Sequence, residues 1–215
     1  VVRSAGSKAN RGIVQPGNAV SVTWQARLAE QKGTFKIEPC TPFSAFVMQD
    51  RLKLAALTSA CALMETALPE RHPYPRLYKE FLGFLSRMSE TEDWQESYVR
   101  LELEVLAESG FGLDLSECAA TGVTDDLIYV SPKSGRAVSC QAGEPYKEKL
   151  LTLPPFLRQD AKTALSAEDK ETLAGLRLSG YFLESRLTGP HGKKLPAARA
   201  RLLTMMKAEH AETED

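Results

Sequence analysis

Alternating apolar and polar residues mark the first regular segment of the chain. Within residues 20–28, one face carries only apolar side chains, which are Val20, Val22, Trp24, Ala26 and Leu28. This period of two is typical of a half-buried β-strand. Residues 34–38 repeat it with Phe35 and Ile37, and the residues between the two segments end at Gly33. The pattern predicts a β-hairpin, preceded by a turn at Gln15–Asn18.

The middle of the chain changes to a helical period. Three apolar series recur at intervals of three and four residues: Leu57, Cys61, Met64 and Leu68; Leu77, Phe81, Phe84 and Met88; Trp94, Tyr98, Leu101 and Val105. Prolines separate the first two series, and Gly110 ends the third. An irregular segment, 110–143, contains one short apolar run at 127–130, and two more helices follow. We therefore predict an α+β protein with a small helical bundle.

Charge is distributed unevenly, although the net charge is only −1. Between residues 1 and 36 the single acid is Glu30, against six bases: Arg3, Lys8, Arg11, Arg27, Lys32 and Lys36. Residues 90–126 reverse this balance, with eleven acids and one base, Arg100. Residues 147–207 are basic again, with twelve bases and six acids. Such asymmetry concerns binding partners rather than fold.

The sequence lacks the patterns of common enzyme sites. It has no glycine-rich nucleotide-binding loop, no HExxH and no GxSxG, and the three histidines have no evident orienting partner. The carboxylates at 102, 104 and 108 fit a solvated helix face. We expect a protein that is not an enzyme and binds no cofactor. No membrane-spanning run and no export signal are found, which favours a cytoplasmic protein with reduced thiols.

The basic residues near the N-terminus are candidates for DNA binding. Cations track phosphates, and aromatic side chains on a β-surface can stack unpaired bases. These arguments select Arg3, Lys8, Arg11, Arg27, Lys32 and Lys36. A solvated loop explains the same charges. Trp24 and Phe35 are either stacking groups or core, and the apolar face they share with Val20 and Val22 favours core.

The basic C-terminal helices suggest a second surface. Arg177, Arg186, Lys193 and Lys194 could receive an acidic peptide or extend a DNA path. For any one of these residues, an ordinary solvated helix surface is the alternative. The chain could accordingly be a protein-interaction adaptor whose partners handle the DNA.

Several blocks of sequence resemble the RecO family of bacterial DNA repair and recombination mediators. They are VQPGNAV at 14–20 followed by Trp24, ALPE at 67–70 followed by Pro73, ESGFGLDLSECAATG at 108–122 and YVSPKSGRAVS at 129–139. The resemblance implies an N-terminal OB-fold β-barrel, a helical domain and a zinc-finger-like insertion. It places a partial OB-fold at 1–45 and the helical domain at 46–215, with the finger-like hairpin at 112–143. The family's OB-fold begins with strands that would lie before Val1. Val1 would then fall inside the barrel, and the barrel formed by this sequence would be incomplete.

The resemblance also implies partners. RecO-like proteins bind single- and double-stranded DNA, anneal complementary strands and bind the acidic C-terminal tail of the single-stranded-DNA-binding protein (SSB). With RecR, and in some pathways RecF, they help to load RecA, and they act at the nucleoid. No membrane partner is implied.

Two cysteines test how far the resemblance extends. Zinc-bearing members have one C-x-x-C pair and then a second. Here Cys118 is present, but Thr121 stands where its partner cysteine would be, and Ala142 or Gly143 stands where the partner of Cys140 would be. Structural zinc needs four ligands, so we expect a degenerate finger that holds no metal. The apolar run at 127–130 must then hold the hairpin. Cys118→Ser should leave stability nearly unchanged, and Ile128→Ala should lower it.

Overall fold

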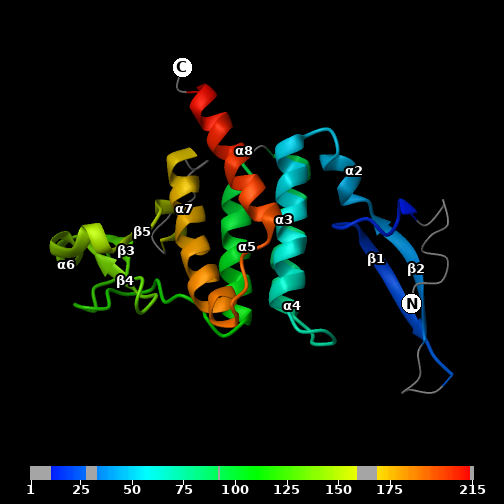
Figure 1. Ribbon diagram of the computed structural model, residues 1–215, viewed down its shortest axis with the longest axis horizontal. Coiled ribbons are helices and arrows are strands. Elements are labelled where there is room, and N and C mark those ends of the chain that lie inside the picture. The colour runs from blue at the N-terminus through cyan, green and yellow to red at the C-terminus, as the bar shows by residue number, and fades with distance from the viewer. Residues whose placement is uncertain (1–10, 28–32, 92, 159–168, 214–215) are drawn as a thin grey trace.

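The computed structural model describes residues 11–27, 33–91, 93–158 and 169–213. It is elongated, with three parts in a row (Figure 1). A two-stranded ribbon lies at one end, a helical bundle lies in the middle, and a small β-insertion lies at the other end. This order agrees with the predicted change from a period of two to a helical period and then to irregular structure.

The ribbon pairs β1 (Ala19–Gln25) with β2 (Thr34–Thr41) in an antiparallel register that places Trp24 opposite Phe35. The predicted turn before it is present, because the Asn18 amide donates to the Gln15 carbonyl over 3.1 Å. Gly17 has φ +89° and lies against Leu57 of the bundle, where a Cβ would come within 2.6 Å of a leucine methyl. A glycine therefore lets the entry to the ribbon pack closely on the helices.

Helices α2 (Phe43–Val47), α3 (Arg51–Ala67), α4 (Pro75–Glu90), α5 (Gln95–Glu108), α7 (Asp169–Phe182) and α8 (Ala197–Thr213) form the bundle. The Asp50 carboxylate caps α3 by accepting the amides of Leu52 and Lys53. Gly110, with φ +84°, follows the end of α5 as predicted. A π-helical turn, η3 (Leu183–Thr188), and a 3₁₀ turn, η4 (Gly189–His191), link α7 to the segment before α8.

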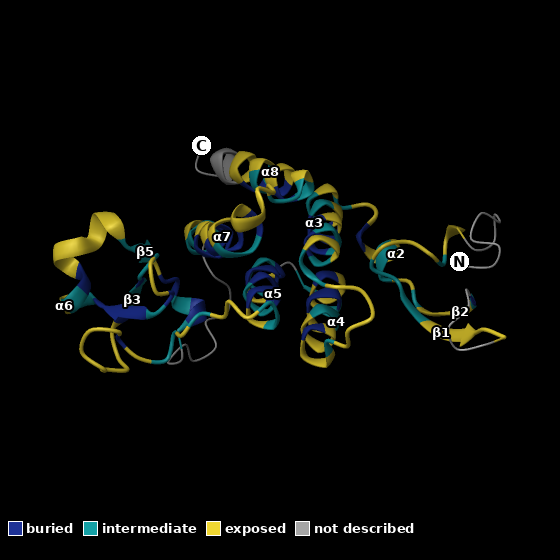
Figure 2. Ribbon diagram, turned by 60° about the horizontal axis from the view of Figure 1, so that its bottom comes forward, coloured by how far each residue is buried: buried dark blue, intermediate teal, exposed yellow. Residues whose placement is uncertain are grey.

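The predicted apolar series form the core. Figure 2 shows buried residues on the facing sides of the helices. Trp94, Tyr98, Leu101 and Val105 of the third series are all at most 2% exposed. The first series is only partly inside, because Leu57 is buried while Cys61 and Met64 lie at its edge.

A charged cluster crosses the bundle interior. The guanidinium of Arg199 from α8 meets the carboxylate of Glu102 from α5, with Nε–Oε1 at 2.6 Å and Nη2–Oε2 at 2.8 Å. The Ser179 hydroxyl from α7 donates to the same carboxylate over 2.5 Å. Burial alone would lower the pKa of Arg199, but the charge of Glu102 holds this pKa above its usual value. The ion pair thus joins α5 to α8, and the Ser179 hydrogen bond adds α7. The prediction that the carboxylate at 102 lies on a solvated helix face is therefore wrong, because Glu102 is buried.

The β-insertion is a three-stranded sheet in the order β4-β3-β5. Its strands are β3 (Leu127–Val130), β4 (Ala137–Ser139) and β5 (Leu151–Thr152). A short helix α6 (Cys140–Gly143) and the 3₁₀ turns η1 (Glu144–Lys149) and η2 (Pro155–Leu157) complete it. The predicted apolar run is β3, with Leu127 and Val130 buried and Ile128 only partly buried. We therefore expect Leu127 and Val130, more than Ile128, to hold this sheet on the bundle.

Candidate nucleic-acid interface

The β1–β2 ribbon presents the described part of the predicted basic surface. Arg11, Arg27 and Lys36 are all exposed. Arg11 lies before the turn that leads into β1, Arg27 follows the end of β1, and Lys36 is in β2. Arg3, Lys8 and Lys32 lie outside the described residues. The structure thus places three of the six predicted cations on or beside one ribbon.

Lys36 is already paired within the chain. Its ammonium lies 2.7 Å from the Glu38 carboxylate, and both side chains are well exposed. The hydrogen bond and charge of Glu38 raise the pKa of Lys36, and those of Lys36 lower the pKa of Glu38. The acid stands two residues away and hence on the same strand face, which the sequence alone could have shown. Lys36 is therefore a weaker candidate for phosphate binding than Arg27.

Trp24 and Phe35 are exposed, which corrects their interpretation as core. Their ring centroids are 4.6 Å apart at an interplanar angle of 54°, and the side chains are 45% and 36% exposed. The reason is that no described element covers the apolar face of the ribbon, where Val22 is also 49% exposed. The described strands form an open ribbon rather than a closed barrel. The OB-fold therefore stays a prediction.

The predicted C-terminal basic residues do not form one cluster of free charges. Arg177 on α7 is exposed, and so are Lys193 and Lys194, which are consecutive residues before α8. Arg186 instead packs its guanidinium over the Phe182 ring, with Cζ 4.6 Å from the ring centroid, and donates to the Lys133 carbonyl over 3.5 Å. It therefore joins the π-helical turn to the β-insertion.

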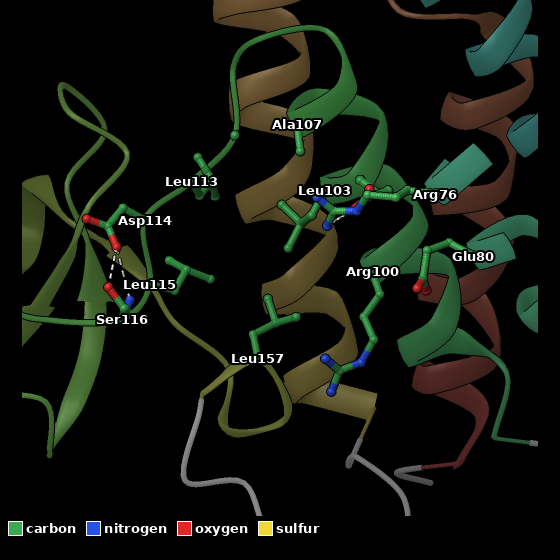
Figure 3. A pocket seen from close by; sticks show the side chains of 12 residues that line it. Arg76, Glu80, Arg100, Leu103, Ala107, Leu113, Asp114, Leu115, Ser116 and Leu157 are labelled. Atoms are coloured by element: carbon green, nitrogen blue, oxygen red, sulfur yellow. Dashed lines mark hydrogen bonds and ion pairs between the residues drawn. The ribbon is translucent and has the colours of Figure 1, made fainter. Parts of the chain in front are cut away.

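A cleft of about 520 Å³ lies between the bundle and the β-insertion. Figure 3 shows Arg76 from α4 and Leu103, Arg100 and Ala107 from α5 on one side, facing Leu113 and Leu115 of the following segment. Leu157 lines it as well. This size is in the range of ordinary ligand sites. No sequence pattern indicates the cleft, although Arg100 is the one base in an acidic segment.

Two arginines and three acids, Glu80, Glu104 and Asp114, give the cleft its polar edge. Arg100 donates to the Phe156 carbonyl and has its guanidinium 5.8 Å from the centroid of the Phe156 ring. Arg76 is 78% exposed and its Nε lies 3.3 Å from the Glu104 carboxylate, which is 13% exposed. Burial raises the pKa of Glu104, Arg76 opposes this, and the charges of Glu108 and Glu80 add to it. Apolar walls beside guanidinium groups can accept a partner with both apolar and anionic groups.

The finger-like insertion holds Cys118 as a buried thiol. The residue is 1% exposed, and its sulfur accepts the Ser139 amide over 3.3 Å. Within the described ranges, no three histidine, cysteine or acidic side chains come close enough to share a metal ion. Cys118 is therefore a buried residue with its own hydrogen bond. The expectation that Cys118→Ser leaves stability nearly unchanged did not take this contact into account.

We predict that Cys118 makes the stability of the protein depend on pH. Burial alone would raise the pKa of its thiol, but hydrogen bonds from the side chains of Ser139 and Thr121 and from the backbone at Ser139 and Ala120 lower it to about 6. The pKa of the thiol in the unfolded chain is about 8.5. The thiolate therefore contributes to the free energy of unfolding fully above pH about 8.5. Its contribution falls by up to about 1.4 kcal/mol per pH unit below that value and is lost as pH falls through about 6.

The measurement is urea unfolding of the wild type and Cys118→Ser across this pH range. The difference in unfolding free energy should widen as pH rises. Cys40→Ser removes an exposed thiol and serves as the control. A difference that is constant with pH would contradict the lowered pKa.

No helix within the described ranges is both long and apolar enough to cross a membrane.

Comparison with known proteins gives consistent matches over most of the chain. The family model described as "Recombination protein O C terminal" matches residues 48–195. DNA repair protein RecO of Rhodospirillum centenum is 48% identical over 202 residues, covering 93% of this chain and 79% of that protein. RecO of Phenylobacterium zucineum is 46% identical over 202 residues, covering 94% and 82%. RecO of Ruegeria sp. is 45% identical over 204 residues, covering 94% and 83%.

The fold and these matches first define a class: DNA repair and recombination proteins in which a helical bundle carries a small β-insertion. Within that class, the chain belongs to the RecO family. The resemblance read from residues 108–122 and 129–139 is thereby confirmed. The domain boundary near residue 45 and the choice of DNA-binding residues stay predictions.

Proposed function

We propose that the protein is a recombination mediator that binds DNA and anneals complementary single strands. On this proposal it helps to load RecA onto SSB-coated single-stranded DNA, together with RecR and in some pathways RecF, in the cytoplasm at the nucleoid. It performs no bond-making chemistry of its own. The observation that carries the proposal is membership of the RecO family over most of the chain.

The geometry of the ribbon supports DNA binding. Exposed Arg11 and Arg27 can neutralise phosphates, and the exposed Trp24–Phe35 pair offers a ring surface on which unpaired bases can stack. We propose that this ribbon belongs to the family's OB-fold. Arg3, Lys8 and Lys32, which lie outside the described residues, stay candidates for the same role.

We expect reversal of Arg27 to weaken DNA binding more than loss of Lys36. An Arg27→Glu change removes an exposed cation, whereas Lys36→Ala removes one that Glu38 already neutralises. Each lost phosphate contact should lower the slope of log affinity against log salt by about 0.7–1. Fluorescence anisotropy of labelled single-stranded DNA at two salt concentrations measures both the affinity and the slope.

Glu38→Gln provides the matched control. It releases Lys36 from its ion pair, so DNA binding should become tighter. Equal losses for Arg27→Glu and Lys36→Ala would show that the ion pair with Glu38 does not weaken Lys36 as a DNA contact. Unchanged affinity in both variants would show that the ribbon is not the DNA surface.

The alternative function is a protein-interaction adaptor whose partners handle the DNA. The cleft of Figure 3 favours it, because Arg100 and Arg76 stand beside apolar walls. Arg76 is paired with Glu104, and Glu80 and Asp114 also line the cleft, so Arg100 is the stronger candidate for a carboxylate of the partner. We propose that an acidic peptide ending in apolar residues, such as the SSB C-terminal tail, binds in the helical region. This partner would place carboxylates at the arginines and apolar side chains against Leu103 and Leu157.

We expect Arg76→Ala and Arg100→Ala each to weaken binding of such a peptide by about two- to fivefold. Titration of a labelled acidic peptide checks this. Arg177→Ala and the double change of Lys193 and Lys194 to alanine test the site chosen from the sequence. If only the latter variants lose affinity, the peptide binds there and the cleft is not its site.

A further inference from the structure

A second hollow lies between α3 and α8, which run beside each other in both ribbon views (Figures 1 and 2). It is a groove of about 270 Å³ and shares no lining residue with the cleft of Figure 3. Its lining includes Arg51, Leu54, Ala55, Ala198, Arg201 and Met205. A groove this small suits a few side chains of a partner better than a drug-sized ligand.

The charges of the groove have one sign. Arg51 and Arg201 are exposed, and no acidic residue is part of the lining. Neither arginine forms an ion pair or side-chain hydrogen bond with any residue in the described ranges. The first turn of α8 contains no acid that would offset the partial positive charge of its N-terminus, whereas Asp50 caps the first turn of α3. The groove therefore favours carboxylates or phosphates.

The floor of the groove decides between these two anions. It is largely apolar, formed by Leu54, Ala55, Ala198 and Met205 with Thr58 at its side, and Leu54 is 40% exposed. A nucleic-acid backbone gains from cations but not from an apolar floor. A protein segment that carries carboxylates around apolar side chains matches both features. A groove between two packed helices suits a third helix in particular.

We propose that the α3–α8 groove docks an amphipathic acidic helix of a protein partner. Its apolar face lies on Leu54 and Met205, and its carboxylates meet Arg51 and Arg201. The groove acts independently of the ribbon and of the cleft. The protein can therefore hold DNA, an extended acidic tail and a helical partner at separate places.

The test uses a labelled helical peptide with leucines at positions i, i+4 and i+7, flanked by glutamates. The wild-type protein should bind it saturably, and the double variant Arg51→Glu, Arg201→Glu should bind it about tenfold more weakly. Leu54→Ser, an exposed change, should also weaken it. Lys207→Ala removes another exposed cation of α8 and should leave binding unchanged, as should Arg100→Ala in the cleft.

Three peptide results overturn the proposal. They are no saturable binding by the wild type, equal binding by the double variant, or equal binding of a peptide whose leucines are replaced by serines. A double variant that loses DNA affinity but keeps peptide affinity would make the groove part of a DNA path. A double variant that changes only the sedimentation behaviour of the protein alone would make it a contact between copies of the chain. Either of these also overturns the proposal, and neither bears on DNA binding by the ribbon.

Discussion

Arg199→Ala should lower the free energy of unfolding by about 3–5 kcal/mol, because it leaves the carboxylate of Glu102 buried without its counter-charge. Glu102 is 1% exposed at its side chain and Arg199 is 4% exposed. Removing the guanidinium also deprives the Leu176 carbonyl of a hydrogen bond of 2.8 Å. In a chain of this size, the corresponding fall in melting temperature is about 10 °C. Urea unfolding followed by circular dichroism measures the loss.

The location of the ion pair explains why so much depends on it. Helix α8 places only Arg199, Leu202 and Met206 among the buried residues of its described side chains. Two apolar side chains fix the position of a helix loosely, whereas a bidentate ion pair fixes its rotation and register. We infer that the pair determines how α8 sits against α5 and α7.

Two companion variants separate this cost from a general effect of mutation. Replacing both Glu102 and Arg199 by methionine removes both charges and should recover much of the loss. Arg201→Ala, two residues further along α8 and exposed, should change stability by no more than about 0.5 kcal/mol. If Arg199→Ala proves as mild as Arg201→Ala, the ion pair does not stabilise the bundle.

The helices and the ribbon could be predicted from sequence because their signals are local. The third apolar series became the buried face of α5, and the alternating segment, predicted over 20–28, forms β1 over Ala19–Gln25. Burial of the ribbon could not be predicted in this way. Alternation shows that Trp24 and Val22 share a face, but whether another element covers that face depends on the whole chain. The preference for core was wrong for this reason.

The same limit applies to charged residues. In the sequence, Arg199 and Arg186 look like any other base of the C-terminal helices, yet one is buried against Glu102 and the other packs on Phe182. Glu102 is 97 residues away from Arg199 in the sequence, whereas Phe182 lies about one helical turn before Arg186. Only the second kind of pairing is open to sequence reasoning. The two arginines of the cleft were missed because they come from different helices.

Phe156→Ala should cost about 3–5 kcal/mol, since it removes a large side chain from the contact between the β-insertion and the bundle. Phe156 is 3% exposed. Its ring reaches the backbone of Gly175 on α7, where a Cβ would stand 2.9 Å from the ring, and Val99 of α5 packs at the same place. No side chain at Gly175 can fill the space that the ring leaves. Thermal and urea unfolding measure the loss.

The same substitution should also weaken acidic-peptide binding in the cleft, because Arg100 rests over the Phe156 ring and Leu157 follows directly in the chain. Phe156→Leu keeps an apolar side chain and should lose less on both measures. Tyr146→Ala removes an aromatic ring of the insertion that is 61% exposed, and should change stability by no more than about 0.5 kcal/mol. Full stability in Phe156→Ala would mean that the insertion is not held through this ring. Lost stability with unchanged peptide affinity would mean that the ring holds the insertion but does not set the position of Arg100.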